Sequence, residues 1–435
     1  MPNDTLFEPL QFRNLTVKNR IFRSNISGRF DNYDGSGNPA RINWELKFAR
    51  AGVGAILSSY CSVQIRGRIL PNYATIDRDD RIPFWRELGK RVHEHDCMFL
   101  LQLSHGGRQR DVGGIEFEKG LSSTDKPDPL HGLEADRMTV ADIKETVAAF
   151  AQGARRAREA GLDGVELHAA NGYLFTQFLS SAINDRDDDY GGPLKNRARF
   201  LLEVVAAIRR EVGRDYHVQA KLSTTEYNNA LAPWEGAGNT IADSIQVCRW
   251  LEEAGVDAIH VSSGASFPHP KNPPGDFPVE EAVKTYDTML SSGSRTLPLY
   301  LALRSGGQLF RAMWVHARGD VIEGISLPDS RAVKQAVGIP VLCTGGFQTA
   351  SVVRHAIESG DCDAVTIARP LVANNDLVQL WAAGHDRPPI PCTYCNKCLV
   401  NVLENPLGCY EESRYGSREE MIRQVLSVFD PPPFV

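Results

Sequence analysis

A unit of helix, glycine and short apolar strand recurs along this chain. In its clearest copy, residues 139–160 place apolar side chains at helical spacing, Gly161 follows, and the strand LDGVELHAA comes next. Similar units read RWLEEAG then VDAIHVSS, VVRHAIESG then DCDAVTIAR and, more weakly, KFARAG then VGAILSSY. Glycine commonly follows the last residue of a helix, and continuous runs of Val, Ile, Leu and Ala are typical of parallel strands buried on both faces. The repeat therefore predicts helices alternating with parallel strands.

Eight strands of this kind can be counted. The other four are RIFRSN, MFLLQL, HVQAKL and IPVLCT, and further helices are expected at 83–95, 196–212 and 330–337. Eight strands alternating with helices predict an α/β fold, the (β/α)8 TIM barrel, which takes about 250 residues and accepts insertions readily. An open doubly wound sheet is the alternative, but this sequence lacks the G-x-G-x-x-G that such a fold carries after its first strand.

Two regions exceed a barrel in this chain of 435 residues. A long insertion follows the sixth strand at about 264–338, and it contains a proline-rich piece and an apolar helical segment, LPLYLALRSGGQLFRAMW. We expect it to cover the barrel mouth, to form a subunit contact, or to add one packed helix pair without function. The expected domains are a barrel over 1–388 and a cysteine-rich C-terminal extension over 389–435.

Charge and the start of the chain narrow the range of partners. A net charge of −6 argues against nucleic acid or an anionic membrane surface as the main partner. No apolar run approaches the length of a membrane span, and the first residues, MPNDTLFEPLQF, lack the pattern of a secretion signal. The sequence therefore predicts a cytoplasmic protein, with a homo-oligomer left open.

The nine cysteines fall into two groups. Five are scattered among apolar segments and are expected to be small buried side chains, namely Cys61, Cys97, Cys248, Cys343 and Cys362. The other four lie within eighteen residues, namely Cys392, Cys395, Cys398 and Cys409. In a reducing compartment such a cluster indicates a metal site rather than disulfides.

The ends of the last two strands carry a pattern that suits phosphate. Gly345 and Gly346 follow the seventh strand, and Ala368 and Arg369 end the eighth. Barrels often bind phosphate at this place, where glycines let backbone N–H groups approach an anion and arginine adds a bidentate charged contact. A glycine pair alone would more often make only a turn, so the prediction depends on both strand ends together.

Polar side chains at the ends of the third, fourth and fifth strands form the expected centre of the site. Gln102 can donate to and accept from an amide-like ring edge. Lys221 can stabilise negative charge on a reduced ring, or it forms an internal ion pair. His168 and Asn171 can both donate to one carbonyl oxygen and stabilise an enolate. Tyr173 can serve as a general acid. Any one of the last three could be purely structural, but three at one strand end indicate a site.

At this point the sequence resembles a known family. The stretch 168–208, which begins HAANGYLFTQFLSSAINDRDDDYGGP, resembles the signature block of old yellow enzyme-like NAD(P)H:flavin oxidoreductases. LFEPLQFRNLTVKNRIFRSNIS, LLQLSHGGRQ and ARPLVANNDL are similar to its other blocks in the same order, so the resemblance covers most of the chain up to residue 390. It implies a barrel that binds FMN and reduces activated double bonds with electrons from NAD(P)H.

The resemblance also implies roles for single residues. Gln102 corresponds to the contact with the flavin pyrimidine, and Ser27 lies where the family tunes the redox properties of the flavin. Lys221 stands in place of the usual arginine, which keeps the charge but loses the planar fork. Asn25 replaces a common proline beside the flavin. The other positions correspond to the grip on the substrate carbonyl (His168, Asn171), the proton donor (Tyr173) and the phosphate contacts (Gly345, Gly346, Ala368, Arg369).

The cysteine spacing resembles the cluster segment of 2,4-dienoyl-CoA reductases and trimethylamine dehydrogenases, which implies a [4Fe–4S] cluster beside the barrel. Three thiols at close spacing and one distant thiol fit such a cluster, because each iron takes one cysteine. Structural zinc, which more often uses two separated pairs, and free thiols are the alternatives. In those relatives a dinucleotide-binding region follows, whereas this chain ends at residue 435. We therefore expect the cluster to serve structure or to meet a separate electron-transfer protein.

The leading hypothesis from the resemblance is an ene-reductase. Hydride would pass from NAD(P)H through FMN to the β-carbon of an α,β-unsaturated carbonyl compound held by His168 and Asn171, and Tyr173 would protonate the α-carbon. His269 resembles a second relay histidine of the dienoyl-CoA reductases, or it is an ordinary residue of a proline-rich loop. Two other functions stay open. One is an amine or N-methyl dehydrogenase that passes electrons through FMN and the cluster, and the other is a non-catalytic flavin electron-transfer subunit.

Overall fold

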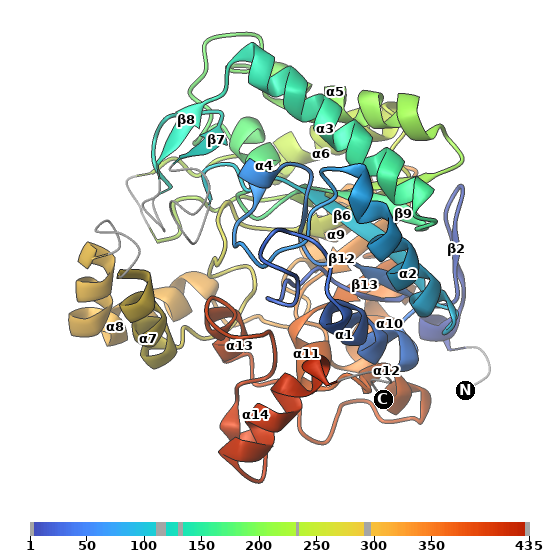
Figure 1. Cartoon of the computed structure of the whole chain (residues 1–435), viewed down its shortest axis with the longest axis vertical. Helices are drawn as coiled ribbons and strands as arrows, with labels where there is room; N and C mark the ends of the chain where they lie inside the picture. The colour runs from blue at the N-terminus through green and yellow to red at the C-terminus, as the bar shows by residue number, and fades with distance from the viewer. Residues whose placement is uncertain (1–3, 110–118, 129–133, 232–234, 291–296, 431–435) are drawn as a thin grey trace.

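The computed structural model describes residues 4–109, 119–128, 134–231, 235–290 and 297–430. Parallel strands form a closed barrel at its centre (Figure 1). In chain order they are β3 (Ile21–Arg23), β4 (Ala55–Leu57), β6 (Met98–Ser104), β9 (Gly164–Ala169), β10 (His217–Ser223), β11 (Ala258–Ser262), β12 (Val341–Thr344) and β13 (Ala364–Ile367). Each strand pairs with the next, and β13 pairs with β3 to close the circle. The predicted (β/α)8 barrel is therefore confirmed.

Helices surround this barrel (Figure 1). The principal ones are α1 (Pro39–Arg50), α2 (Ile82–His93), α3 (Val140–Glu159), α5 (Leu194–Val212), α6 (Ile241–Glu253), α9 (Leu327–Lys334), α10 (Ala350–Glu358) and α12 (Leu377–Ala382). Local sequence sets their ends, as α3 illustrates. Thr139 and Asp142 form a capping box at its start, and Gly161 follows its end with a φ of 76°. Every residue of β9 and β10 is buried, as the continuous apolar runs predict.

A hairpin packs against one end of the barrel. Its strands β1 (Leu10–Gln11) and β2 (Thr16–Val17) place Leu10, Phe12 and Val17 against the strand residues Phe22 and Leu100. This apolar cluster fills the end at which the strands begin. The carboxyl ends of the strands are therefore left to form the functional face.

The long insertion and the C-terminal extension lie beside the barrel. The insertion contains α7 (Val279–Leu290) and α8 (Leu297–Arg318), which project to one side in Figure 1, and α8 includes the helix expected from the sequence. Phe277 packs against Trp314 beneath this pair, with ring centroids 5.2 Å apart. The extension carries α13 (Lys397–Asn401) and α14 (Arg418–Leu426). Within the described ranges, no helix is both long and apolar enough to cross a membrane.

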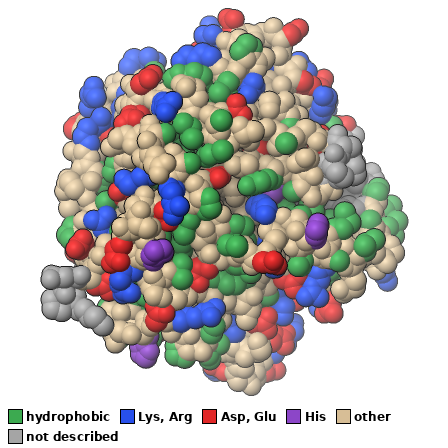
Figure 2. Space-filling view, turned by 180° about the vertical axis from the view of Figure 1, so that it is seen from behind, with side chains coloured by type: hydrophobic (Ala, Val, Ile, Leu, Met, Phe, Trp, Pro, Cys, Tyr) green, Lys and Arg blue, Asp and Glu red, His purple; other side chains and the backbone are tan. Residues whose placement is uncertain are grey.

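Shorter elements complete the molecule. They are β5 (Cys61–Ser62) beside β6, the pair β7 (Gly120–Ser122) and β8 (Ala135–Arg137), and the helices α4 (Leu174–Leu179) and α11 (Arg369–Ala373). The five scattered cysteines are all buried, as predicted. Figure 2 shows the opposite face of the molecule, on which Lys and Arg side chains are intermingled with Asp and Glu side chains.

Candidate functional site

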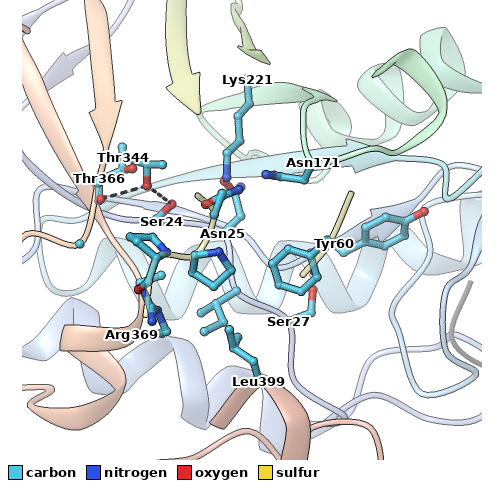
Figure 3. Close-up of a pocket in the computed structure, with 18 of the residues that line it drawn as sticks. Ser24, Asn25, Ser27, Tyr60, Asn171, Lys221, Thr344, Thr366, Arg369 and Leu399 are labelled. Atoms are coloured by element: carbon cyan, nitrogen blue, oxygen red, sulfur yellow. Dashed lines mark hydrogen bonds between the residues drawn. The ribbon is translucent and has the colours of Figure 1, made fainter. Parts of the chain in front are cut away.

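A cavity with about 970 Å³ of empty space, partly open to solvent, lies at the carboxyl ends of the barrel strands. Every residue that the sequence nominated for cofactor or substrate contact lines it. These residues are Asn25, Ser27, Gln102, His168, Asn171, Tyr173, Lys221, Gly345, Gly346, Ala368 and Arg369. They come from strands far apart in the chain, and barrel closure brings them together. Figure 3 shows Lys221 and Asn25 between Arg369 on one side and Tyr60 and Ser27 on the other.

The turn after β9 is held in an uncommon backbone conformation. Asn171 has a φ of 63°, which asparagine tolerates better than most residues. Its N–H donates to Ser223 Oγ at 2.9 Å, and Gln109 Nε2 donates to its carbonyl oxygen at 3.0 Å. Gly172 follows with a φ of 81°, and a Cβ there would lie 2.3 Å from the carbonyl oxygen of Ala265. These hydrogen bonds and this close contact hold the turn in place. Uncommon backbone conformations of this kind are frequent at functional sites.

His168, Asn171 and Tyr173 meet at one wall of the cavity. His168 Nε2 lies 3.2 Å from Asn171 Oδ1, and Nδ1 lies 3.3 Å from Ser104 Oγ. The Tyr173 ring packs on the His168 ring with centroids 4.6 Å apart. Burial, together with the positive charge of Lys221, lowers the pKa of His168 to about 3. At neutral pH the imidazole is therefore uncharged, and it carries a single N–H, which is shared with Asn171 or Ser104.

A cation and an unpaired acceptor lie deeper in the cavity. Lys221 Nζ donates to Asn25 Oδ1 at 3.1 Å (Figure 3). Burial lowers the pKa of Lys221 to about 8, although the negative charge of Glu166 opposes this shift. Gln102 Nε2 donates to Glu166 Oε1 at 3.0 Å, whereas Gln102 Oε1 is buried with no hydrogen-bond partner. A buried acceptor without a partner needs a donor, and the amide edge of a flavin ring carries one.

The corner between β12 and β13 suits a phosphate. Gly346 has a φ of 71°, and a Cβ there would lie 3.0 Å from the carbonyl oxygen of Ile322. Arg369 is 4% exposed, and its guanidinium donates to the carbonyl oxygen of Pro274 at 2.7 Å and to Asn396 Oδ1. The residues present therefore fit FMN in kind, with an arginine and a glycine turn for the phosphate and an amide for the ring.

The four clustered cysteines line a second, smaller cavity with about 310 Å³ of empty space. Arg369 lines this cavity as well as the first one. Burial raises the pKa of the Cys392 thiol, and the positive charge of Arg369 opposes this effect. Within the described part of the chain, no group of three or more His, Cys, Asp or Glu side chains is arranged to hold a metal ion. Four thiols match a four-iron cluster in their chemistry, but among the described residues their arrangement does not show a metal site.

Sequence reasoning missed several lining residues. Tyr60 ends the apolar run of β4, and Thr344 and Thr366 lie in β12 and β13, so strand position could have nominated these three. Leu399 and Val402 come from the C-terminal extension, and no sequence pattern points to them. Further lining residues include Ser24, Ile26, Tyr73, Phe267, Lys271, Asn272, Pro273 and Pro274, of which the last five come from the start of the long insertion.

His269 is not among the residues that line the cavity. Its Nε2 lies 3.1 Å from the carbonyl oxygen of Tyr227, and its Nδ1 accepts from the backbone N–H of Lys271 at 3.0 Å. Both ring nitrogens are therefore used to hold the loop. Of the two alternatives for His269, these contacts favour the ordinary residue of a proline-rich loop.

Comparison with known proteins supports the family resemblance. Residues 5–289 match the NADH:flavin oxidoreductase / NADH oxidase family. The chain is 28% identical to an NADH oxidase of Thermoanaerobacter brockii over 94% of this chain and 57% of that protein. It is also 28% identical to a cinnamate reductase of Clostridium sporogenes over 97% of this chain and 61% of that protein. The chain thus spans little more than half the length of these relatives.

Solved structures share the fold. A complex of 2-naphthoyl-CoA reductase with 2-naphthoyl-CoA has a TM-score of 0.75 at 23% identity, over 93% of this chain and 56% of that chain. An old yellow enzyme homologue from Zymomonas mobilis has a TM-score of 0.65 at 19% identity, over 88% of this chain and 94% of that chain. At such low identity the likeness concerns the architecture alone.

Proposed function

Because the chain belongs to the NADH:flavin oxidoreductase / NADH oxidase family, we propose that it is an FMN-dependent ene-reductase. It would use NAD(P)H to reduce the activated C=C bond of an α,β-unsaturated carbonyl compound. The observation that carries this proposal is the meeting of His168, Asn171 and Tyr173 at one wall of the cavity. The cinnamate reductase among the relatives supports an unsaturated substrate.

The two donors at the end of β9 would hold the substrate carbonyl. Bound FMN would supply the hydride chemistry that no side chain can provide. His168 Nε2 lies 3.2 Å from Asn171 Oδ1, and Asn171 Nδ2 donates to Ser262 Oγ at 3.4 Å. On substrate binding the neutral His168 and the amide of Asn171 would each turn an N–H to the carbonyl oxygen, which becomes negative as the double bond is reduced. An uncharged imidazole suits this role, because it stabilises the developing charge without giving up its proton.

Tyr173 would supply the proton at the α-carbon. It is 7% exposed and packs between His168 and Tyr60, with ring centroids 4.6 Å and 5.5 Å away. A phenol held beside the carbonyl donors would be near the α-carbon of a bound substrate, where the proton is needed. This assignment also disfavours a non-catalytic electron-transfer subunit, which has no use for a proton donor there.

We further propose that Cys392, Cys395, Cys398 and Cys409 hold a [4Fe–4S] cluster. Their shared cavity and the spacing of the first three support this assignment. Arg369 lines both cavities, so the proposed cluster site and the proposed FMN site share this residue. The cluster would exchange electrons with a separate protein or serve structure, and zinc is the alternative that metal analysis would reveal.

The function is tested by anaerobic visible spectroscopy of the purified protein. An ene-reductase would show flavin bands that NADH or NADPH bleaches and that an unsaturated carbonyl compound restores. Bleaching by a methylated amine, with no response to NAD(P)H, would instead indicate an amine dehydrogenase. A protein that binds no flavin would overturn the proposal.

Replacement Tyr173→Phe tests the proton donor. We expect enone reduction to fall at least about 100-fold, because one general acid contributes at least that much. Bleaching of the flavin by NAD(P)H should keep its rate, since that half-reaction needs no proton from Tyr173.

Tyr190→Phe is the matched control for this change. Tyr190 is another buried tyrosine of the same sequence block, and its hydroxyl pairs with Glu203 outside the cavity. Tyr190→Phe should leave the rates of flavin reduction and of enone reduction unchanged. Undiminished turnover in Tyr173→Phe would remove the assigned role.

A further inference from the structure

A buried acidic residue lies beneath the cavity and has no role in the proposed reaction. Glu166, in the middle of β9, is fully buried. Its Oε1 accepts from Gln102 Nε2 at 3.0 Å, and its Oε2 accepts from Gln219 Nε2 at 2.6 Å and lies 2.8 Å from His260 Nδ1. Barrel interiors are usually filled by Val, Ile and Leu. A polar group at this position therefore needs an explanation.

Strand register places these side chains at one level of the barrel. Gln102 lies opposite Glu166 in the pairing of β6 with β9, and Gln219 lies opposite Glu166 in the pairing of β10 with β9. His260 reaches the same carboxylate from β11, and its Nε2 lies 2.8 Å from Thr366 Oγ1. Glu166 is thus surrounded by donors from three strands. Burial would raise the pKa of Glu166, but His260, Lys221 and Gln219 outweigh it and lower the pKa to about 2, so the group is a carboxylate.

An ionised carboxylate decides how the Gln102 amide is turned. A carboxylate only accepts hydrogen bonds, so it can bind the NH2 end of the amide and not the oxygen. Gln102 Oε1 is consequently left buried and without a partner, in a residue that lines the cavity. The amide therefore presents an acceptor rather than a donor to whatever ring occupies the cavity.

We propose that Glu166 is a positioning residue that locks the Gln102 amide, so that the site selects a ring edge with an N–H donor. This inference rests on the proposed function, in which the ring is the flavin of FMN. The flavin pyrimidine edge presents two carbonyl oxygens on either side of N3–H, and Gln102 Oε1 would bind N3–H. Neutral Gln at position 166 would offer an NH2 as well as an oxygen, and the Gln102 amide could then turn over.

The test uses the apoprotein reloaded with FMN that carries 15N at N3. In the wild-type protein we expect a resolved N3–H resonance that exchanges slowly with water, because a buried acceptor holds the proton. In Glu166→Gln we expect this resonance to shift and to exchange faster, with a dissociation constant for FMN about tenfold higher. Thermal unfolding is recorded for each variant as the readout of a merely structural effect.

Glu226→Gln is the matched control. Glu226 is another carboxyl of the barrel that is 1% exposed, and it bonds to Ser180 without touching Gln102. Glu226→Gln should leave the N3–H resonance unchanged, whatever it does to stability. Gln102→Leu should remove the slow exchange, and adding Glu166→Gln to Gln102→Leu should then change nothing further.

The outcomes separate this inference from the proposed function. A wild-type protein that binds FMN but shows N3–H exchange as fast as in free FMN overturns the inference and leaves the function standing, and this holds even where a variant does not fold. An unchanged N3–H resonance in folded Glu166→Gln overturns it too. Failure of the wild-type protein to bind FMN removes the proposed function itself.

Discussion

Burial sets the charge of two basic side chains that line the cavity, His168 and Lys221. The pKa of His168 is lowered to about 3, so this residue stays neutral through the physiological range. The pKa of Lys221 is lowered to about 8, so this residue loses its proton within reach of ordinary experiments. Its hydrogen bond to the neutral Asn25 does not oppose that loss as a carboxylate would. The charge facing the ring is therefore sensitive to pH.

We expect the affinity for FMN to depend on this charge. Lys221 is protonated below its pKa, so affinity should be constant up to about pH 7 and weaken as the pH rises through about 8, by at most about tenfold per unit. Lys221→Arg should keep the affinity level over the same range, because arginine stays charged. The affinity of the wild-type apoprotein and of Lys221→Arg for FMN is measured by fluorescence titration from about pH 6.5 to about pH 9.5. A level wild-type profile would show that the lysine charge does not contribute.

At the scale of elements, the turn after β9 depends on a close approach between two loops. Gly172 lies against Ala265 of the β11 loop, and it is flanked by Asn171 and Tyr173. Any side chain at Gly172 would push the two loops apart. The side chains proposed to be catalytic are thus placed by packing between strand ends as well as by their own strand.

Gly172→Ala should damage both stability and catalysis. We expect a loss of about 1–3 kcal/mol in the free energy of unfolding, from the positive φ and the close contact, and a fall in turnover of at least about tenfold as Asn171 and Tyr173 move. Gly161→Ala is the control, since Gly161 also has a positive φ but nothing lies within 4 Å of the added Cβ. It should cost about 1 kcal/mol and leave turnover intact. Denaturant unfolding measures the loss of stability, and steady-state kinetics measure turnover. Equal turnover in both variants would contradict the packing argument.

At the scale of the whole molecule, the C-terminal extension and the barrel build the site together. The Tyr394 hydroxyl donates to the carbonyl oxygen of Gly346, and Asn396 accepts from Arg369. Leu399 and Val402 line the same cavity as Lys221. The division into 1–388 and 389–435 stays a prediction, and residues from both sides of its boundary line this cavity.

Cys398→Ser should affect both sites. We expect iron, at about four atoms per wild-type chain, to be lost. The FMN content should also fall, because Leu399 directly follows Cys398 and lines the larger cavity, in which we propose that FMN binds. Cys362→Ser is the control, since Cys362 is buried but lines neither of these cavities. It should retain both cofactors. Zinc in place of iron in the wild-type protein would contradict the cluster, and full FMN content in Cys398→Ser would contradict the coupling.

The sequence by itself determined the barrel and most of the candidate site. Helix periodicity, glycine ends and apolar runs are local signals, and parallel strands align their carboxyl ends, so residues such as Gln102 and Arg369 could be nominated from strand position alone. Only the tertiary structure decided which residues contact one another around the cavity. Leu399 reaches the cavity wall because the C-terminal extension packs on the barrel. The carboxylate of Glu166 lies beneath Gln102 because of strand register, which joins residues far apart in the chain. Local patterns hold no information on such contacts, because their energies arise only once the strands are paired.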